Sequence, residues 1–168
     1  MNFLVLNFNA SRTSSLVKIR NFLNFINQYE PIFVAIQEIN IVSALKIFRE
    51  KFQVIVNIEE GSKDGIGMVC LIKKDINIVD TILGVNGRII GIKIKNVQFW
   101  NVYPHSGTNC KNRREIFFRE ELTGYMMNWK DSTRYIFEVG DHNCCHRALD
   151  SLHNSSQHLQ PALIKHMQ

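Results

Sequence analysis

The stretch Pro31-Ile32-Phe33-Val34-Ala35-Ile36-Gln37-Glu38 is a six-residue apolar run that ends on an amide and a carboxylate. A short, continuous apolar run of this kind predicts a strand that is buried on both faces. The strand should end at Gln37-Glu38, so we expect the carboxylate of Glu38 at the edge of the core, where solvation is reduced. A hard cation such as Mg²⁺ suits that position, because it prefers carboxylate and water oxygens.

Outward from this stretch, the apolar pattern changes repeatedly between strand and helix periods. Strand patterns run through 2–8, 52–57, 68–72, 76–84, 88–95, 97–103 and 135–139, with a hairpin signal at Asn86-Gly87. Helical spacing runs through Leu16–Ile26 after a Ser14 or Ser15 cap, through Val42–Phe48 and 112–129, and through a closing helix at Leu159, Leu163 and Met167. Helices mixed with runs of adjacent strands predict one α/β domain over 1–168, built as a sandwich rather than a doubly wound sheet.

Composition narrows the class of protein. The chain has 168 residues, of which 45% are hydrophobic, enough for one domain with a sizeable core. Its 20 basic and 15 acidic residues give a net charge of +5, which suits a polyanionic partner such as nucleic acid. The N-terminus lacks the features of a signal peptide, and no apolar run approaches the ~20 residues that span a bilayer. The four cysteines form no regular framework, so reduced thiols in the nucleus or cytoplasm are expected.

Polar residues gather at the expected ends of four strands. They are Asn7 with Asn9, Gln37 with Glu38, Asn101 with Tyr103, and Asp141 with Asn143. Any single pair is ordinarily a turn or a cap, but strands packed in one core could bring all four ends to one rim. There, Asn7 would add an amide oxygen beside Glu38. Asp141 could orient or deprotonate a water, while Asn143 and Tyr103 could donate hydrogen bonds to a phosphate oxygen.

Four short motifs occur in order along the chain: Leu6-Asn7-Phe8-Asn9, Ile36-Gln37-Glu38, Asn101-Val102-Tyr103-Pro104 and Gly140-Asp141-His142-Asn143. Together they resemble the successive motifs of the endonuclease/exonuclease/phosphatase superfamily. Within it, the likeness is greatest to the apurinic-endonuclease-like nuclease domain of LINE-type (non-LTR) retrotransposons. Arg113-Arg114-Glu115-Ile116-Phe117-Phe118 and Asp150 strengthen the resemblance, which spans residues 1 to about 150.

The resemblance implies a fold and a set of roles. Members are four-layer α/β sandwiches with a DNase I-like fold. By likeness, Glu38 would be the principal ligand of Mg²⁺, or of Mn²⁺ in its place, with Asn7 in the metal and phosphate site. Tyr103 would contact the scissile phosphate, Asp141 would position or activate the attacking water, and Asn143 would stabilise the pentacovalent transition state. The reaction would nick DNA and leave a 3′-hydroxyl, which a reverse transcriptase domain further along the full-length protein could use as a primer.

Two departures from the family pattern matter. His142 stands where the family usually has phenylalanine, which should cost packing rather than chemistry. The chain also lacks the terminal Ser-Asp-His-like motif, so we expect a C-terminally truncated copy that is impaired in cleavage and exposes apolar surface near 135–139 or 159–167. Two alternatives therefore stay open: a phosphatase of the same superfamily that acts on inositol or lipid phosphates, and a decayed, non-catalytic copy.

Other clusters each allow two interpretations. The loop 142–146 holds two histidines and two cysteines, which are zinc-ligand types but are crowded together rather than paired at the usual spacing. The basic residues Lys111, Arg113 and Arg114 could follow a nucleic-acid backbone or lie in solvent at a helix start. One of Phe99 and Trp100 is expected in the core, and the alternative role for these rings is stacking on a base. Cys70 is expected to be a core thiol.

Overall fold

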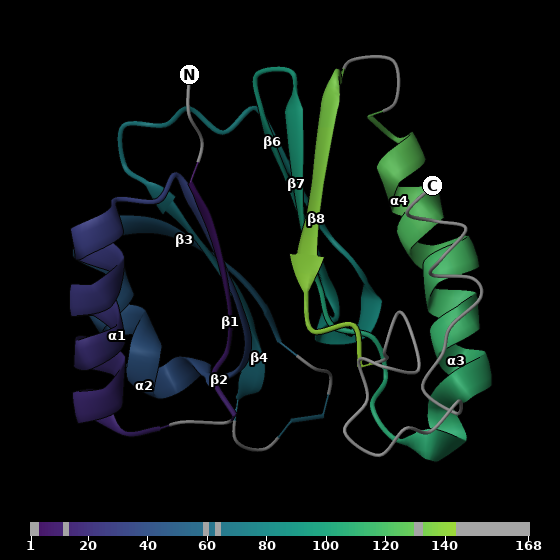
Figure 1. Cartoon of the computed structure of the whole chain (residues 1–168), viewed down its shortest axis with the longest axis horizontal. Coiled ribbons are helices and arrows are strands. Elements are labelled where there is room, and N and C mark those ends of the chain that lie inside the picture. The colour runs from purple at the N-terminus through teal and green to yellow at the C-terminus, as the bar shows by residue number, and fades with distance from the viewer. Residues whose placement is uncertain (1–3, 12–13, 59–60, 63–64, 130–132, 144–168) are drawn as a thin grey trace.

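A computed structural model of the chain describes residues 4–11, 14–58, 61–62, 65–129 and 133–143. Figure 1 shows how its elements are arranged. The strands are β1 (Val5–Asn9), β2 (Phe33–Asn40), β3 (Phe52–Ile58), β4 (Ile66–Lys73), β5 (Asp80–Leu83), β6 (Ile89–Ile94), β7 (Val97–Val102) and β8 (Tyr135–Gly140). The helices are α1 (Leu16–Tyr29), α2 (Ile41–Arg49), α3 (Lys111–Ile116) and α4 (Thr123–Met127), with a π-helical segment, Phe117–Leu122, joining the last two.

The strands form two four-stranded sheets. The first has the order β1-β2-β4-β3 and the second has the order β5-β6-β7-β8. Within each sheet one pair is parallel, β1 with β2 and β7 with β8, and the other neighbours are antiparallel. The carboxyl ends of the two strands in each parallel pair therefore lie at the same edge of their sheet.

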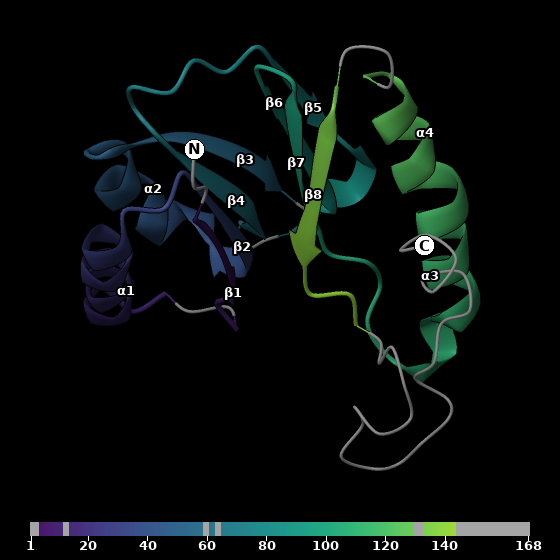
Figure 2. The same cartoon turned by 45° about the horizontal axis from the view of Figure 1, so that its top comes forward.

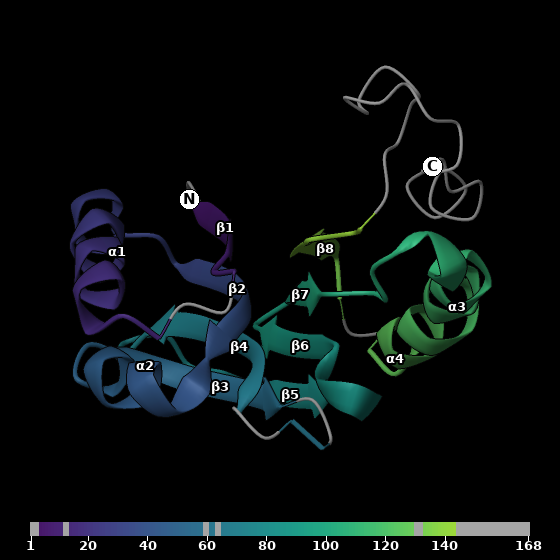
Figure 3. The same ribbon diagram turned by 90° about the horizontal axis from the view of Figure 1, so that it is seen from below.

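Three apolar layers separate the sheets and helices, whose stacking Figure 3 shows from below. Alternate residues of β2 define two of the layers: Val34 and Ile36 pack against α1 and α2, whereas Phe33 and Ala35 face the second sheet. The third layer lies between the second sheet and the helix that runs from α3 to α4, which covers the outer face of that sheet (Figure 2). The chain is thus an α/β sandwich of four layers, as predicted from its sequence.

The local signals in α1 and α2 produce the expected helices. The Ser15 side chain caps α1 by accepting a hydrogen bond from the backbone N–H of Lys18. Ile19, Leu23 and Ile26 form the buried stripe of that helix. The closing helix expected at 159–167 lies outside the described residues.

Two strand predictions differ from the structure. The strand that begins at Phe33 does not end at Gln37-Glu38 but continues to Asn40. The connection between β5 and β6 is longer than the predicted two-residue turn, because Val85–Gly87 forms a 3₁₀ turn in which Asn86 takes a left-handed conformation. Turn chemistry marks the reversal of the chain, but the lengths of the flanking strands depend on their partners in the sheet.

Phe99 and Trp100 are both fully buried, so the base-stacking interpretation is wrong for each of them. Phe99 stacks on Phe33 between the two sheets, with ring centroids 5.0 Å apart, whereas Trp100 packs on Trp129 in the outer layer. Successive residues of a strand point to opposite faces, and here both faces of β7 are covered. Gly91 makes room for the indole, because a Cβ at this position would lie 2.4 Å from the Trp100 ring.

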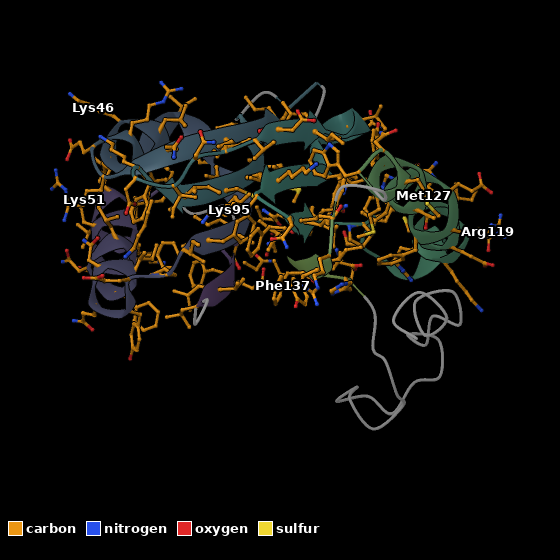
Figure 4. All side chains as sticks on the ribbon, turned by 90° about the horizontal axis from the view of Figure 1, so that it is seen from above. Lys46, Lys51, Lys95, Arg119, Met127 and Phe137 are labelled. Atoms are coloured by element: carbon orange, nitrogen blue, oxygen red, sulfur yellow. The ribbon has the colours of Figure 1, made fainter. Side chains whose placement is uncertain are left out.

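Strand β8 carries exposed apolar side chains on both of its faces. Tyr135, Ile136 and Phe137 are 39–55% exposed, and β8 pairs only with β7 among the described strands. Figure 4 marks Phe137 at the margin of the core. Apolar surface near 135–139 was expected from the sequence, and residues 159–167 are not described. None of the described helices has the length and apolar character to cross a lipid bilayer.

Candidate active site

The polar residues at the four strand ends meet at one end of the sandwich. Strands β1 (purple) and β8 (yellow-green) run side by side at the junction of the two sheets (Figure 1). Side-chain contacts that join the sheets here include Asn9 with Asp141, Asn7 with Gly140, and Glu38 with Tyr103. The structure therefore brings together Asn7, Glu38, Tyr103 and Asp141, and it places Asn143 on the loop that follows β8.

Glu38 owes its position to a β-bulge. The aligned pairs of β2 and β4 are Ile36 with Val69 and then Ile39 with Gly67, so two residues of β2 oppose one residue of β4. Glu38 has a left-handed backbone with φ of 53°, which costs a residue with a side chain about 1 to 2 kcal/mol. Bulges redirect side chains near active sites, and this one leaves the Glu38 carboxylate only half-buried between two buried neighbours.

Tyr103 lies between Glu38 and Arg88. Its hydroxyl donates a hydrogen bond to the carboxylate of Glu38. The Arg88 guanidinium carbon lies 5.5 Å from the centre of the Tyr103 ring, and its Nη1 donates to the Tyr103 carbonyl at 3.2 Å. Burial, the hydrogen bond with Glu38 and the negative charges of Glu38 and Asp141 raise the pKa of Tyr103 to about 12. The phenol is therefore a neutral hydrogen-bond donor at physiological pH.

Asp141 is held as an acceptor by two neighbours. Its Oδ2 accepts a hydrogen bond from Nδ2 of Asn9 at 2.8 Å, and its Oδ1 accepts one from the backbone N–H of Asn143 at 3.0 Å. Both donors hold the Asp141 carboxylate in one orientation. The Asn143 side chain donates to the carbonyl of Pro104 at 2.8 Å, which ties the loop after β8 to the loop after β7.

A chain of buried amides lies beneath these residues. Gln37 and Asn101 are fully buried, and Nε2 of Gln37 donates to Oδ1 of Asn101 at 2.7 Å and to Oδ1 of Asn7 at 2.8 Å. Nδ2 of Asn7 in turn donates to the carbonyl of Gly140 at 3.1 Å. Cys70 is a core thiol, as expected; burial raises the pKa of its thiol, and the hydrogen bond from Asn101 lowers it.

His142 is half-buried and occupies a packing position. Its ring stacks on Phe118 with centroids 5.8 Å apart, and its Nε2 lies 2.9 Å from a carboxylate oxygen of Glu138. An aromatic ring at this position thus retains a packing partner. The two cysteines and the second histidine of the possible zinc cluster lie outside the described residues.

The basic cluster at the start of α3 divides into two kinds of residue. Arg114 is buried, and its guanidinium donates to the carbonyls of His105 and Gly107, so it cannot follow a nucleic-acid backbone. Lys111 and Arg113 are exposed. Arg88 was not singled out from the sequence, because a single arginine after a turn has no distinctive pattern.

The donor atoms at this end of the sandwich fit a hard divalent cation. The carboxylate of Glu38 and the amide oxygen of Asn7, which also accepts from Gln37, are oxygen ligands, and the carboxylate of Asp141 lies nearby. The described residues contain no group of three or more His, Cys, Asp or Glu side chains that could hold a metal. Mg²⁺ is typically bound by only one or two carboxylates, and water and substrate oxygens complete its coordination shell.

The contact between Tyr103 and Glu38 can be tested by titrating the phenol. Below pH 11 we expect the tyrosinate absorbance at 295 nm to be the same in the wild type and in Tyr103→Phe, because the Tyr103 pKa is about 12. In Glu38→Gln the pKa should move toward the ordinary value of about 10, because one negative charge is removed. A Tyr103 that ionises near pH 10 in the wild type would contradict the observed geometry.

This arrangement of sheets, helices and converging strand ends is the DNase I-like fold of the endonuclease/exonuclease/phosphatase enzymes. The protein is similar to truncated TDP2 from Caenorhabditis elegans, with a TM-score of 0.66 and 13% identity over 88% of this chain and 64% of that one. An AP endonuclease from Archaeoglobus fulgidus gives a TM-score of 0.66, with 14% identity over 96% of this chain and 67% of that one. The 3′ phosphatase NExo from Neisseria, bound to a product DNA hairpin, gives 0.65, with 15% identity over 84% and 58%.

At these identities the likeness defines the fold. The chain spans 64% of the worm TDP2 chain and 58% of NExo. No family model and no curated protein matches the sequence.

Proposed function

We propose that this chain is a metal-dependent phosphodiesterase domain that hydrolyses DNA. One observation carries the proposal: the Tyr103 hydroxyl donates to the carboxylate of Glu38, and the carboxylate of Asp141, directly after β8, lies close enough for its charge to raise the pKa of the same phenol. Two carboxylates and a neutral donor around one point can serve the metal, the attacking water and the phosphate of a phosphoryl-transfer reaction.

Each side chain has a defined task in this proposal. Asp141, oriented by Asn9 and by the Asn143 backbone, positions the water and accepts its proton. Tyr103 remains protonated and donates to a phosphate oxygen, which requires its single O–H to turn away from the carboxylate of Glu38. Asn143 supplies a second donor, which requires its amide to leave the carbonyl of Pro104.

Glu38 and Asn7 would hold Mg²⁺ or Mn²⁺. When bound, the cation would supply positive charge for the phosphate and for the developing charge on its oxygens. Hydrogen bonds orient both side chains before the cation binds. Gln37 holds Asn7, and Tyr103 holds Glu38.

DNA is the proposed substrate. The net charge of +5 favours a polyanion, and Lys18 lines a hollow of about 510 Å³ beside Asn9 that reaches one side of the site. Other cations, such as Lys46 and Arg119, lie on outer helices at opposite ends of the molecule (Figure 4). The structural neighbours include an AP endonuclease and a 3′ phosphatase bound to DNA. The finer proposal, a LINE-type nuclease joined to a reverse transcriptase, rests on the ordered sequence motifs alone.

The proposal is tested by nicking of supercoiled plasmid, which registers a single cut per circle and so detects slow turnover. We expect open circles in Mg²⁺ and none in EDTA. Asp141→Asn should lower the rate by about 10² to 10⁴, the usual contribution of a general base. Asp75→Asn, the same chemical change at an exposed position lining a different hollow, should leave the rate unchanged.

Two other results would favour one of the alternative functions over this proposal. Metal-dependent release of phosphate from an inositol phosphate, without nicking, would favour the phosphatase alternative. DNA binding without hydrolysis of either substrate would favour a non-catalytic copy.

A further inference from the structure

The bulge that carries Glu38 is supported from the opposite sheet. Asn101 lies in β7, yet its Nδ2 donates to the carbonyls of Ile36 and Val69, at 3.3 and 3.2 Å. These two residues are the last aligned pair of β2 and β4 before the bulge. Because a left-handed glutamate persists only where its surroundings enforce it, the residue that secures this pair is well placed to maintain the bulge.

The Asn101 amide also sets the orientation of the Gln37 and Asn7 amides. The nitrogen of Asn101 faces two backbone carbonyls, so its oxygen is the atom that faces Gln37, and Gln37 must present its nitrogen in return. That nitrogen also donates to Asn7, whose own nitrogen is thereby directed to the carbonyl of Gly140. The orientation of the exposed Asn7 amide is therefore set by a fully buried residue.

Stability alone does not explain amides at these positions. Oε1 of Gln37 is buried and has no hydrogen-bond partner among the described residues. A buried acceptor without a partner opposes folding, and an apolar residue of similar size would avoid that cost. Local rules are commonly broken in this way at functional sites.

We propose that Asn101 is a positioning residue of the metal site: it maintains the bulge that presents Glu38 and, through Gln37, fixes the amide of Asn7. The inference rests on the proposed function, because it assumes that Glu38 and Asn7 bind the cation. Asn101 itself touches neither cation nor substrate. It acts at a distance, as the residues that orient metal ligands do.

The test compares Asn101→Leu, a change of similar volume, with Ile92→Ala. Ile92 is buried in the same layer between the sheets, so its truncation lowers stability without touching the amides. We expect Asn101→Leu to raise the Kd for Mn²⁺, measured by calorimetry on the whole chain, by about 10- to 100-fold. Without metal, amide hydrogen exchange at 37–39 should accelerate relative to β3, which contains none of the substituted residues, by about tenfold or more. Ile92→Ala should change neither quantity.

Each outcome decides the proposal. A folded Asn101→Leu protein that matches Ile92→Ala in both measurements overturns it. If Asn101→Leu does not fold, Gln37→Met decides, because it removes the donors to Asn7 and Asn101 but leaves the bonds to Ile36 and Val69; an unchanged Mn²⁺ affinity then overturns the proposal. If the wild type binds no Mn²⁺, the proposed metal site fails, while the exchange measurement still shows whether Asn101 maintains the bulge.

Discussion

Glu38→Gln is expected to lower the rate of plasmid nicking in Mg²⁺ by about 10³, or about 4 kcal/mol of transition-state stabilisation. The amide keeps the size of the side chain and an oxygen that can accept the Tyr103 hydroxyl. It removes the negative charge, which is the property a hard divalent cation requires. The free energy of unfolding should change by only about 0.5 kcal/mol.

The matched control is Glu120→Gln, the same change on an exposed helical residue that pairs with Arg119. It should leave the rate unaltered. The two variants and the wild type are compared for nicking across a Mg²⁺ series and for unfolding in urea. A Glu38→Gln protein that nicks at the wild-type rate would remove Glu38 from the proposed metal site.

Gly140→Ala is expected to disrupt the loop that carries Asp141 and Asn143. A Cβ at this position would lie 1.9 Å from the carbonyl oxygen of Val102, its partner in the pairing of β7 and β8. Backbone cannot yield as a flexible side chain can, so the end of β8 must move. We expect a loss of about 3 kcal/mol in the free energy of unfolding. A shift of about 1 Å in the loop should lower the nicking rate by about 10² in addition.

Gly124→Ala provides the same chemical change without the clash, because nothing lies within 4 Å of a Cβ there. Gly124 is an exposed residue of α4, so alanine should stabilise the protein by up to about 1 kcal/mol. Urea unfolding and the plasmid assay measure both variants. If Gly140→Ala were as stable and as active as the wild type, the close packing of β8 on Val102 would be contradicted.

Much of the fold follows from signals that act over a few residues. The period of the apolar residues predicts α1, α2 and the helix from α3 to α4, and the Ser15 cap is confirmed. The four polar strand ends were also visible in the sequence, and the structure gathers them at one end of the sandwich. The roles assigned to Asn7, Glu38, Tyr103, Asp141 and Asn143 stay predictions.

Three other features of the structure could not be predicted from neighbouring residues in the sequence. Nothing in the six apolar residues before Gln37 predicts that β2 continues past Glu38, because the bulge depends on β4 and on Asn101 from the other sheet. Arg114 carries a charge that predicts exposure, yet it is buried beneath two backbone carbonyls. Trp100 is buried because Gly91, on the neighbouring strand, leaves space for its ring.

The sequence by itself determined the elements, the alternation that gives each sheet two apolar faces, and the order in which oxygen-bearing residues follow the strands. These properties depend on neighbours along the chain, and the periods of strand and helix report them directly. Only the tertiary structure decided which side chains face one another: Tyr103 toward Glu38, Asn9 toward Asp141, and Asn101 beneath the bulge. Such contacts join residues dozens of positions apart, because they arise from the packing of two sheets whose relative position no local pattern specifies.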